Sequence, residues 1–566
     1  MTRDGTFSAA AGLTPPGAGH AGWKMTPGRL LSIGTRLITF GAVVLALPGC
    51  SRDWPAFRHN ALRTAQQANK SPLADPAQVP GLAVRWTYPP TGALSPFRAS
   101  PIVYEGRAFI GNRNGRFYAL DANTGALLWQ YPPAASPGLT SLFTCNPSSE
   151  GIASSAVIAS VNGKDAVIFG APDQSLGTGL GEGRLFALDV ATGAELWKSP
   201  VVARLTGTTW GSTSEFHEQI GYSSPLVFNG RVYVGVADHC DNPIQKGRVV
   251  AVLLSTGAID AGFSYCSTGT CGDSTRGGGV WSSVAGWDDS VYVTTGNVKS
   301  GQAFEPSPNR GLSMLRLDKN TGAVTWQFQP VPWALDGDPD WNATVSVQLA
   351  SCGEMIVGTQ KDGWTHAVNV APSGGGASKR WSFPAHATPF TAADGTAHGD
   401  TRYMRSGAVW RDVYIAVNGG LNLTSSGVTG GLRRLHAFNA CAAEADRVRW
   451  LLDVPSTSAC APGDPYCYRV GQPVVTRGMV YVGTDQGHVL AIADPSIWPG
   501  AGWRCSNPDV TTANCVVSGY SFVPEPSVLA NVALPDGGRV VYTEPALARG
   551  KLYVATEAGH VYMLSP

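Results

Sequence analysis

The sequence predicts an all-β protein, an eight-bladed β-propeller of four-stranded antiparallel blades, and three observations carry that prediction. The 566 residues include 69 Gly, 40 Pro and 17 Trp, but only 14% are charged. Short runs of Val, Tyr, Ile and Thr alternate with Gly, Asn and Asp turns, a pattern typical of many short strands. One unit recurs along the chain, and its last copy stops one strand short.

The recurring unit begins with a strand, a Gly turn and a second strand that ends in Ala-Leu-Asp. A Thr-Gly turn and a third strand, which carries Trp, complete the unit. Its clearest copy is GRAFIGNRNGRFYALDANTGALLWQY, residues 106–131. Because each copy is one supersecondary unit, a ring of such units is expected. Eight copies begin near Gly106, Asp165, Gly230, Asp289, Glu354, Asp412, Gly478 and Gly550.

The Trp strands indicate how the ring closes. The first of them, LAVRWTYP at 82–89, precedes any complete unit, whereas the last unit, 550–566, ends before its Trp strand. We therefore expect the N-terminal strand to complete the final blade, which removes exposed sheet edges. A solenoid or two β-sandwiches would leave this mismatch unexplained. The predicted Trp strands lie at Trp86, Trp129, Trp197, Phe263/Tyr265, Trp326, Trp381, Trp450 and Trp503.

On this reading residues 80–566 form one propeller domain and residues 50–79 are a linker that lies on it. Residues 1–49 are interpreted as a leader and lipoprotein signal peptide, because two arginines precede an apolar stretch at 37–47 that is too short to span a bilayer. The stretch ends in LPGC, which resembles a bacterial lipobox and implies lipidation of Cys50; a plain signal peptide is the alternative. The following Ser51 favours the outer membrane. We expect an exported protein, periplasmic or on the cell surface.

The cysteines agree with export, because eleven Cys minus Cys50 leave an even number for an oxidising compartment. No Cys-x-x-Cys occurs, which argues against a zinc ribbon and covalent haem. The net charge of +1 gives no reason to expect nucleic acid as a partner. Three close pairs are expected to close small loops, Cys266/Cys271, Cys460/Cys467 and Cys505/Cys515, whereas Cys145, Cys240, Cys352 and Cys441 have no deducible pairing.

The repeat itself resembles a known family. GRLFALDVATGAELW, residues 183–197, is similar to the repeat of quinoprotein dehydrogenases and of non-enzymatic outer-membrane assembly lipoproteins. The segment GGGVWSSVAGWDDSVYVTTGN, 277–297, resembles the quinoprotein segment that holds a stacking Trp and a metal-binding Asn. The resemblance implies that Trp281 stacks on pyrroloquinoline quinone (PQQ) and that Asn297 offers its carbonyl oxygen to Ca²⁺, or to a lanthanide.

The same resemblance implies a catalytic Asp, the base that takes the alcohol proton, after the next Trp strand. Three candidates stand there, Asp336, Asp338 and Asp340. We favour Asp340, which leads straight into the next blade, with Asp338 as runner-up. Lanthanide-preferring members carry a second Asp two residues after the first, a spacing that Asp338 and Asp340 fit and that would make Asp340 a metal ligand. Lys361, in EMIVGTQKDGWTHAVNV, occupies the place of the cation beside the quinone oxygens.

The sequence also departs from the family. Residues 231–252 align with the segment that gives the family its Glu metal ligand, but they contain no Glu, so Asp238 or Asp241 would substitute. The family's adjacent Cys pair is missing: Cys145 stands alone near that place, and Glu150 replaces an expected Arg. The nearest branch is expected to be that of the polyvinyl-alcohol dehydrogenases, without a haem domain.

The resemblance implies a PQQ-dependent alcohol dehydrogenase that passes electrons to a separate periplasmic cytochrome or quinone. The alternatives are a non-enzymatic scaffold or binding lipoprotein and, third, an extracellular glycan- or polymer-binding propeller with the loops 206–219 and 456–468 as its rim. We favour the enzyme because Trp, Asn, Asp and Lys fall in consecutive units in the family's order.

Overall fold

The computed structural model describes most of the chain from Arg52 to Pro566. The described residues are 52–566 except 144–150, 176, 213, 239–243, 270, 272–276, 299–309, 331–339, 342, 362–363, 371–377, 385–404, 425–426, 445–446, 455–468 and 495–525, with backbone alone at 384, 418–424 and 427–432.

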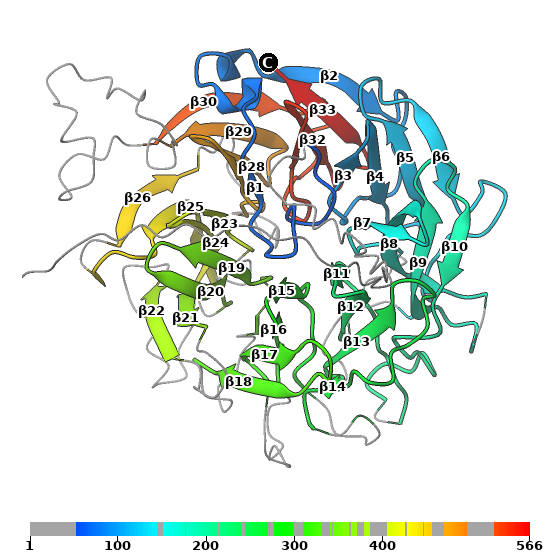
Figure 1. Cartoon of the computed structure of the whole chain (residues 1–566). Coiled ribbons are helices and arrows are strands. Elements are labelled where there is room, and N and C mark those ends of the chain that lie inside the picture. The colour runs from blue at the N-terminus through cyan, green and yellow to red at the C-terminus, as the bar shows by residue number, and fades with distance from the viewer. Residues whose placement is uncertain are drawn as a thin grey trace, which may run out of the picture. The chain divides into compact units, whose positions relative to one another are not determined.

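The described chain forms eight antiparallel sheets that follow one another around a ring (Figure 1). The eight-bladed propeller predicted from the repeat is confirmed. In order from the innermost strand outwards, the blades are blade 1, β3 (Ile102–Tyr104), β4 (Arg107–Gly111), β5 (Phe117–Asp121) and β6 (Leu127–Tyr131); blade 2, β7 (Val157–Val161), β8 (Lys164–Asp173), β9 (Glu182–Asp189) and β10 (Glu195–Lys198); blade 3, β11 (Leu226–Phe228), β12 (Arg231–Val236), β13 (Arg248–Leu253) and β14 (Tyr265–Cys266); and blade 4, β15 (Ala285–Trp287), β16 (Ser290–Thr294), β17 (Met314–Asp318) and β18 (Val324–Phe328).

The second half of the ring repeats this order. It consists of blade 5, β19 (Ser346–Ala350), β20 (Gly353–Thr359), β21 (Trp364–Asn369) and β22 (Ser378–Pro384); blade 6, β23 (Ala408–Trp410), β24 (Val413–Thr424), β25 (Gly427–Asn439) and β26 (Val448–Asp453); blade 7, β27 (Val474–Thr476), β28 (Met479–Gly483), β29 (His488–Ala493) and β30 (Ser527–Ala533); and blade 8, β31 (Ala546–Ala548), β32 (Lys551–Ala555), β33 (Val561–Ser565) and β2 (Ala83–Tyr88).

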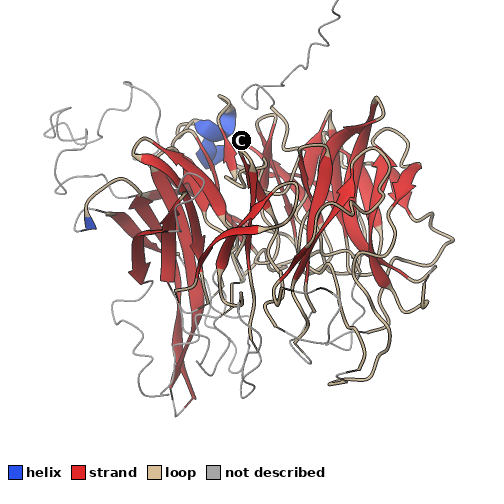
Figure 2. Cartoon of the chain, turned by 60° about the horizontal axis from the view of Figure 1, so that its bottom comes forward, coloured by secondary structure: helices blue, strands red, loops and turns tan. Residues whose placement is uncertain are grey.

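Ring closure by the N-terminal strand is confirmed. Strand β2 pairs antiparallel with β33, from Ala83 opposite Ser565 to Tyr88 opposite Val561, and so becomes the outer strand of blade 8. Two short 3-10 helices, η1 (Pro72–Ala74) and η2 (Val79–Gly81), precede it. Figure 2 shows how strands dominate the fold. None of the described helices has the length and apolar character needed to cross a membrane.

The tryptophans of the outer strands join neighbouring blades. The indole of Trp129 in blade 1 donates a hydrogen bond of 3.2 Å to the carbonyl of Val190 in blade 2. A Cβ at Gly193, in the Thr-Gly turn of blade 2, would lie 2.6 Å from that indole, and Gly193 has a φ of +71°. The turn therefore requires glycine for its conformation and for the close approach of Trp129. Trp86 and Trp197 repeat these contacts with Gly125 and Gly257.

Blade 7 corrects one sequence prediction. Its outer strand is Ser527–Ala533, which carries no Trp, rather than a strand around Trp503. The segment SVLANVA is a short run of Val, Leu and Ala that pairs with β29, whereas Pro, Gly and Cys stand near Trp503. Trp503 itself lies outside the described residues.

Two disulfides are present in the described part of the chain. The predicted bond Cys266–Cys271 is confirmed. The second joins Cys352, in the turn after β19, to Cys441, after β25 in the next blade, across 89 residues of chain. This pairing could not be deduced from the sequence, because the two cysteines lie 89 residues apart and no sequence pattern connects them. Cys145, Cys240 and the pairs Cys460/Cys467 and Cys505/Cys515 lie outside the described residues.

Residues 52–67 do not behave as the linker predicted from the sequence. They run along the innermost strands and end in β1 (Gln66–Gln67), which pairs parallel with β27. Arg58 and Trp54 have no solvent exposure. The segment therefore forms part of the propeller's centre, because its backbone bonds to successive blades where no other strand could pair. These backbone contacts are Arg52–Arg549, Trp54–Val103, Pro55–Ile158, Ala61–Gly286, Leu62–Val347, Thr64–Val409 and Ala65–Val475.

Candidate functional site

A belt of hydrogen bonds between blades fixes the level of the candidate site. Two residues before the inner strand of most blades stands a Ser or Thr whose side-chain oxygen accepts a hydrogen bond from the backbone N–H of the equivalent residue one blade earlier. The bonds, 2.8–3.0 Å long, run Glu544→Ser100→Ser155→Ser224→Ser283→Thr344→Ser406. Because equivalent residues bond directly, equivalent positions in different blades lie at the same level around the axis.

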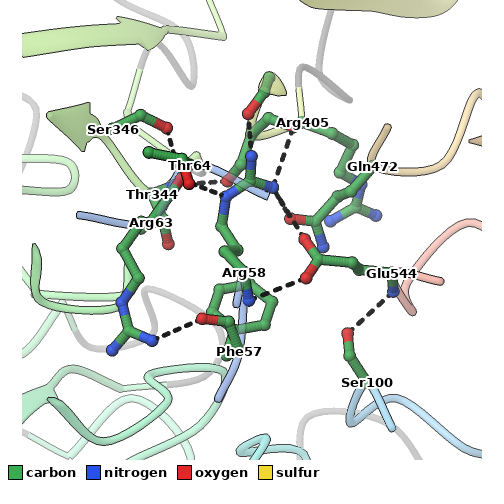
Figure 3. Close-up of polar contacts among 12 residues, drawn as sticks. Phe57, Arg58, Arg63, Thr64, Ser100, Thr344, Ser346, Arg405, Gln472 and Glu544 are labelled. Carbon is green, nitrogen blue, oxygen red and sulfur yellow. Dashed lines mark hydrogen bonds and ion pairs between the residues drawn. The ribbon is translucent and has the colours of Figure 1, made fainter. Parts of the chain in front are cut away.

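Blades 7 and 8 carry Gln472 and Glu544 at the belt position, and Arg58 of the central segment bonds to both side chains. Its Nη1 lies 2.9 Å from Glu544 Oε2 and 3.3 Å from Gln472 Oε1 (Figure 3). The backbone N–H of Arg58 donates to Glu544 Oε1 at 2.8 Å. Arg58 and Glu544 form an ion pair without solvent exposure on either side chain. The Arg58–Glu544 ion pair therefore completes the belt in the blades that have no Ser or Thr at the belt position.

All the described site residues predicted from sequence lie at one end of the blades. Trp281 and Asp340 precede the inner strands β15 and β19. Asn297, Asp238 and Lys361 follow the second strands β16, β12 and β20. In an antiparallel blade the inner strand begins, and the second strand ends, at the same face. The belt lies at that face too, since it immediately precedes the inner strands.

Trp281 stands two residues before the belt residue Ser283, and glycine contacts hold its ring. A Cβ at Gly296 would come within 2.9 Å of the indole Cδ1 and Nε1, and a Cβ at Gly279 within 3.5 Å of Nε1. The side chain is half-buried rather than packed in a seam between sheets. These glycines let the indole lie close to the backbone while part of the ring stays accessible, an arrangement that fits stacking against a flat ligand.

Asp340 and Lys361 form a second part of the site. Lys361 Nζ lies 2.7 Å from Asp340 Oδ1, and the Lys361 backbone N–H donates to the Asp340 carbonyl at 3.1 Å. The Asp340 side chain is 4% exposed and the Lys361 side chain 15%. Thr294, in the same blade as Trp281, donates to the carbonyl of Ala343 at 3.2 Å and so links the two parts. The carboxylate and the ammonium group therefore form a largely buried ion pair at this face.

The oxygen donors predicted to bind a metal are present but less clearly grouped. Asn297 is 7% exposed, and its backbone carbonyl accepts a hydrogen bond from Gly278 at 2.8 Å. Asp238 is 4% exposed and accepts from the Gln245 N–H at 2.8 Å. Across the described residues no three His, Cys, Asp or Glu side chains form a metal-binding group. Asp241, Asp336, Asp338, Glu150 and Cys50 lie outside them.

A group of residues at the level of Trp281 was not predicted from the sequence. Arg98, Tyr222 and Tyr542 each stand two residues before the belt residue of their own blade, as Trp281 does. No motif marks them, because their side chains differ from blade to blade. The repeat register could have found them, since it aligns the short segment before each inner strand.

The fold, the half-buried indole and the buried carboxylate–ammonium pair are features expected of a propeller of the quinoprotein class. The family described as glucose/ethanol/alcohol dehydrogenase with a PQQ β-propeller domain matches residues 56–344. The chain belongs to this PQQ-dependent dehydrogenase family. The match covers most of the central segment, residues 52–67, and includes Trp281, Asn297 and Asp340. PQQ and a metal ion are therefore the cofactors that the family implies for this site.

Several relatives have similar sequences. The chain is 24% identical over 342 residues to a quinohemoprotein alcohol dehydrogenase of Comamonas testosteroni, which covers 56% of this chain and 43% of the relative. It is 25% identical over 404 residues to the dehydrogenase subunit of a quinone alcohol dehydrogenase of Gluconobacter oxydans, covering 62% and 48%. It is 23% identical over 348 residues to a polyvinylalcohol dehydrogenase of Sphingopyxis, covering 54% and 47%. These matches span less than half of each relative's length.

Solved structures support the same fold. The quinohemoprotein alcohol dehydrogenase of Comamonas testosteroni superposes with a TM-score of 0.60 at 18% identity, covering 91% of this chain and 80% of that one. A europium-containing methanol dehydrogenase superposes with a TM-score of 0.56 at 15% identity, covering 92% and 98%.

Proposed function

We propose that this protein is a PQQ-dependent dehydrogenase that oxidises an alcohol. One observation carries the proposal: a buried Asp340–Lys361 pair lies at the same face, and in the blade next to, the half-buried indole of Trp281. A non-enzymatic propeller needs no such pair at the mouth of its axis. The relatives named as alcohol dehydrogenases support the reaction class.

Each residue of the site has a separate role in the proposed reaction. Trp281 offers a flat apolar surface on one side of the cofactor and excludes water there. Asp340 accepts the hydroxyl proton of the alcohol, and Lys361, paired with it, orients the carboxylate and would supply positive charge to the bound quinone. Bound PQQ would supply the hydride acceptor for the alcohol carbon, and a separate cytochrome or quinone would be the final electron acceptor.

We further propose that Asn297 and Asp340 supply oxygen ligands to a Ca²⁺ or lanthanide ion, with Asp238 or Asp241 as a third. Both ions prefer oxygen donors, and amide and carboxylate oxygens are the groups available here. Charge supplied by the ion would polarise the quinone.

A titration tests the proposal. Purified protein is titrated with PQQ in the presence of Ca²⁺ or La³⁺, and tryptophan fluorescence and quinone absorbance are followed. We expect saturable binding that Trp281→Ala weakens at least about tenfold, because the stacking surface is lost. Trp287→Phe, at the opposite end of β15, should bind as the wild type does. Absence of binding with either metal would contradict the proposal and favour the scaffold alternative.

We also propose that the protein is exported and anchored to the outer membrane through lipidated Cys50. The disulfides Cys266–Cys271 and Cys352–Cys441 support an oxidising compartment. Labelling of cells with a fatty-acid probe should mark the wild type and Ser51→Ala but not Cys50→Ser, which should leave the membrane fraction. An unlabelled wild-type protein would contradict the anchor.

A further inference from the structure

Three arginines converge on one tyrosine at the mouth of the axis. The guanidinium carbons of Arg98, Arg405 and Arg469 lie 4.5, 4.7 and 5.8 Å from the centre of the Tyr542 ring. They belong to three different blades, in the segments before β3, β23 and β27, and Tyr542 precedes β31. Cations at this distance from an aromatic ring are attracted to its face.

Tyr222 places this group on the axis. Arg98 Nη1 donates to the Tyr222 hydroxyl at 2.6 Å, and the Tyr222 and Tyr542 rings stack with centres 6.4 Å apart. Because Tyr222 belongs to blade 3 and Tyr542 to blade 8, this contact crosses the middle of the ring. We call Arg98, Arg405, Arg469, Tyr222 and Tyr542 the axial cage. It lies at the level of Trp281.

The axial cage holds more positive than negative charge. Within the described residues, the carboxylate that faces it is Glu557, 3.7 Å from Arg98 Nε. Arg405 Nε has no hydrogen-bond acceptor in this part of the chain. Burial raises the pKa of Glu557 and lowers the pKa of Arg405, so both charges are poorly solvated. An anion that bonds to the guanidinium groups would offset this unfavourable field.

We propose that the axial cage is a binding site for the carboxylate groups of a small organic anion. A guanidinium matches a carboxylate with two parallel hydrogen bonds, a geometry that lysine lacks. Arg98, Arg405, Tyr222 and Tyr542 keep some solvent exposure, 9% for the Arg98 side chain, so a ligand can approach them. The proposal does not depend on dehydrogenase activity.

The axial cage adjoins the proposed cofactor site on two sides. Thr359, two residues before Lys361, donates to the carbonyl of Arg405 at 2.9 Å. On the other side, the belt bond from Ser224 to Ser283 joins the segments of Tyr222 and Trp281. The carboxylates therefore come from one of two sources, the quinone itself or a substrate that carries a carboxylate.

Calorimetric titration of the cofactor-free protein with citrate, succinate and PQQ tests the proposal. We expect saturable binding of a carboxylate or of PQQ that Arg405→Gln weakens at least about tenfold. Arg405→Lys, which keeps the charge without the planar fork, should give a smaller loss. Arg85→Gln, an exposed arginine on β2 that bonds to Ser565, should bind as the wild type does. Thermal unfolding curves establish that each variant is folded.

Competition separates the two sources. If Arg405→Gln weakens PQQ binding and citrate displaces PQQ, the axial cage holds the quinone's carboxylates. If PQQ affinity is unchanged and the loaded protein still binds succinate through Arg405, the axial cage holds a substrate carboxylate. If neither carboxylates nor PQQ bind more weakly to Arg405→Gln and Arg98→Gln than to the wild type, the axial cage is not an anion site; normal PQQ binding in these variants would leave the proposed function intact.

Discussion

Replacing Asp340 by Asn is expected to reduce alcohol oxidation by the cofactor-loaded protein about 10²- to 10⁴-fold, the range lost with a general base. Asparagine has nearly the same shape, so the contact with Lys361 and the backbone bond between the two residues can persist. The amide cannot accept the alcohol proton. The rate is measured with an artificial electron-accepting dye, and PQQ binding is titrated in parallel and should change less than about threefold.

A matched substitution at the opposite face controls for the change itself. Asp289 lies in the turn between β15 and β16, where its carboxylate is 74% exposed and pairs with Lys319. The Asp289→Asn variant should therefore oxidise the alcohol at the wild-type rate. Retained activity in Asp340→Asn would contradict the assignment and move the base to Asp338 or Asp336. Loss of PQQ binding along with activity would instead indicate that Asp340 acts mainly through the metal.

The fold could be predicted because every blade repeats the same local signals. The Trp of an outer strand contacts the Thr-Gly turn of the adjacent blade, as Trp129 contacts Gly193. The sequence pattern of one unit therefore indicates how that unit packs on the next. The unfinished last unit then required β2 to close the ring. Among the blades, the outer strand of blade 7 was assigned wrongly, because a long insertion precedes it in the sequence.

The candidate site was predictable in part for the same reason. Trp281 and Asp340 lie shortly before the inner strands of their blades. The repeat therefore predicts at which end of the blade each residue lies. The repeat register points to Arg98, Tyr222 and Tyr542 but not to Arg405 and Arg469, which stand one and three residues before their belt residues instead of two. Only closure of the ring brings together arginines so distant in sequence.

Residues 52–67 were misread because their polar side chains resemble those of an exposed linker. Arg63 shows why they are buried: it donates to the carbonyls of Phe57, Pro225 and Val284, at 2.8–2.9 Å. Inner strands that meet at an axis leave carbonyl groups without strand partners, and a guanidinium with five donors can satisfy several at once. A buried arginine here reflects the geometry of the ring rather than any local sequence pattern.

Removing Arg58 is expected to lower the free energy of unfolding by about 3–5 kcal/mol, the usual loss when one member of a buried ion pair is removed. Arg58→Met keeps most of the side-chain volume but leaves the Glu544 carboxylate without its partner at 2.9 Å. It also leaves Gln472 and the Gly407 carbonyl without a donor. The loss is measured as the shift in the denaturant midpoint at constant slope.

The loss should depend on pH in a defined direction. Burial raises the pKa of Glu544 from 4.5 to about 7, and Arg58 opposes that shift. A carboxyl with a raised pKa in the folded state stabilises the protein fully below its unfolded pKa, and this contribution is lost as the pH rises through the folded pKa. Arg58→Met raises the folded pKa further, so the difference from the wild type should widen between pH 6 and pH 9.

Glu544→Gln separates charge from packing. The amide keeps a hydrogen-bond acceptor for Arg58, and this variant should lose the decline in stability between about pH 4.5 and pH 7 that Glu544 causes in the wild type. The double variant Arg58→Met/Glu544→Gln carries no buried charge at this position and should be more stable than Arg58→Met alone, since coupled residues are not additive. Simple additivity of the two single losses, or a loss for Arg58→Met that does not vary with pH, would show that Arg58 stabilises the axis through its carbonyl contacts and not through the ion pair.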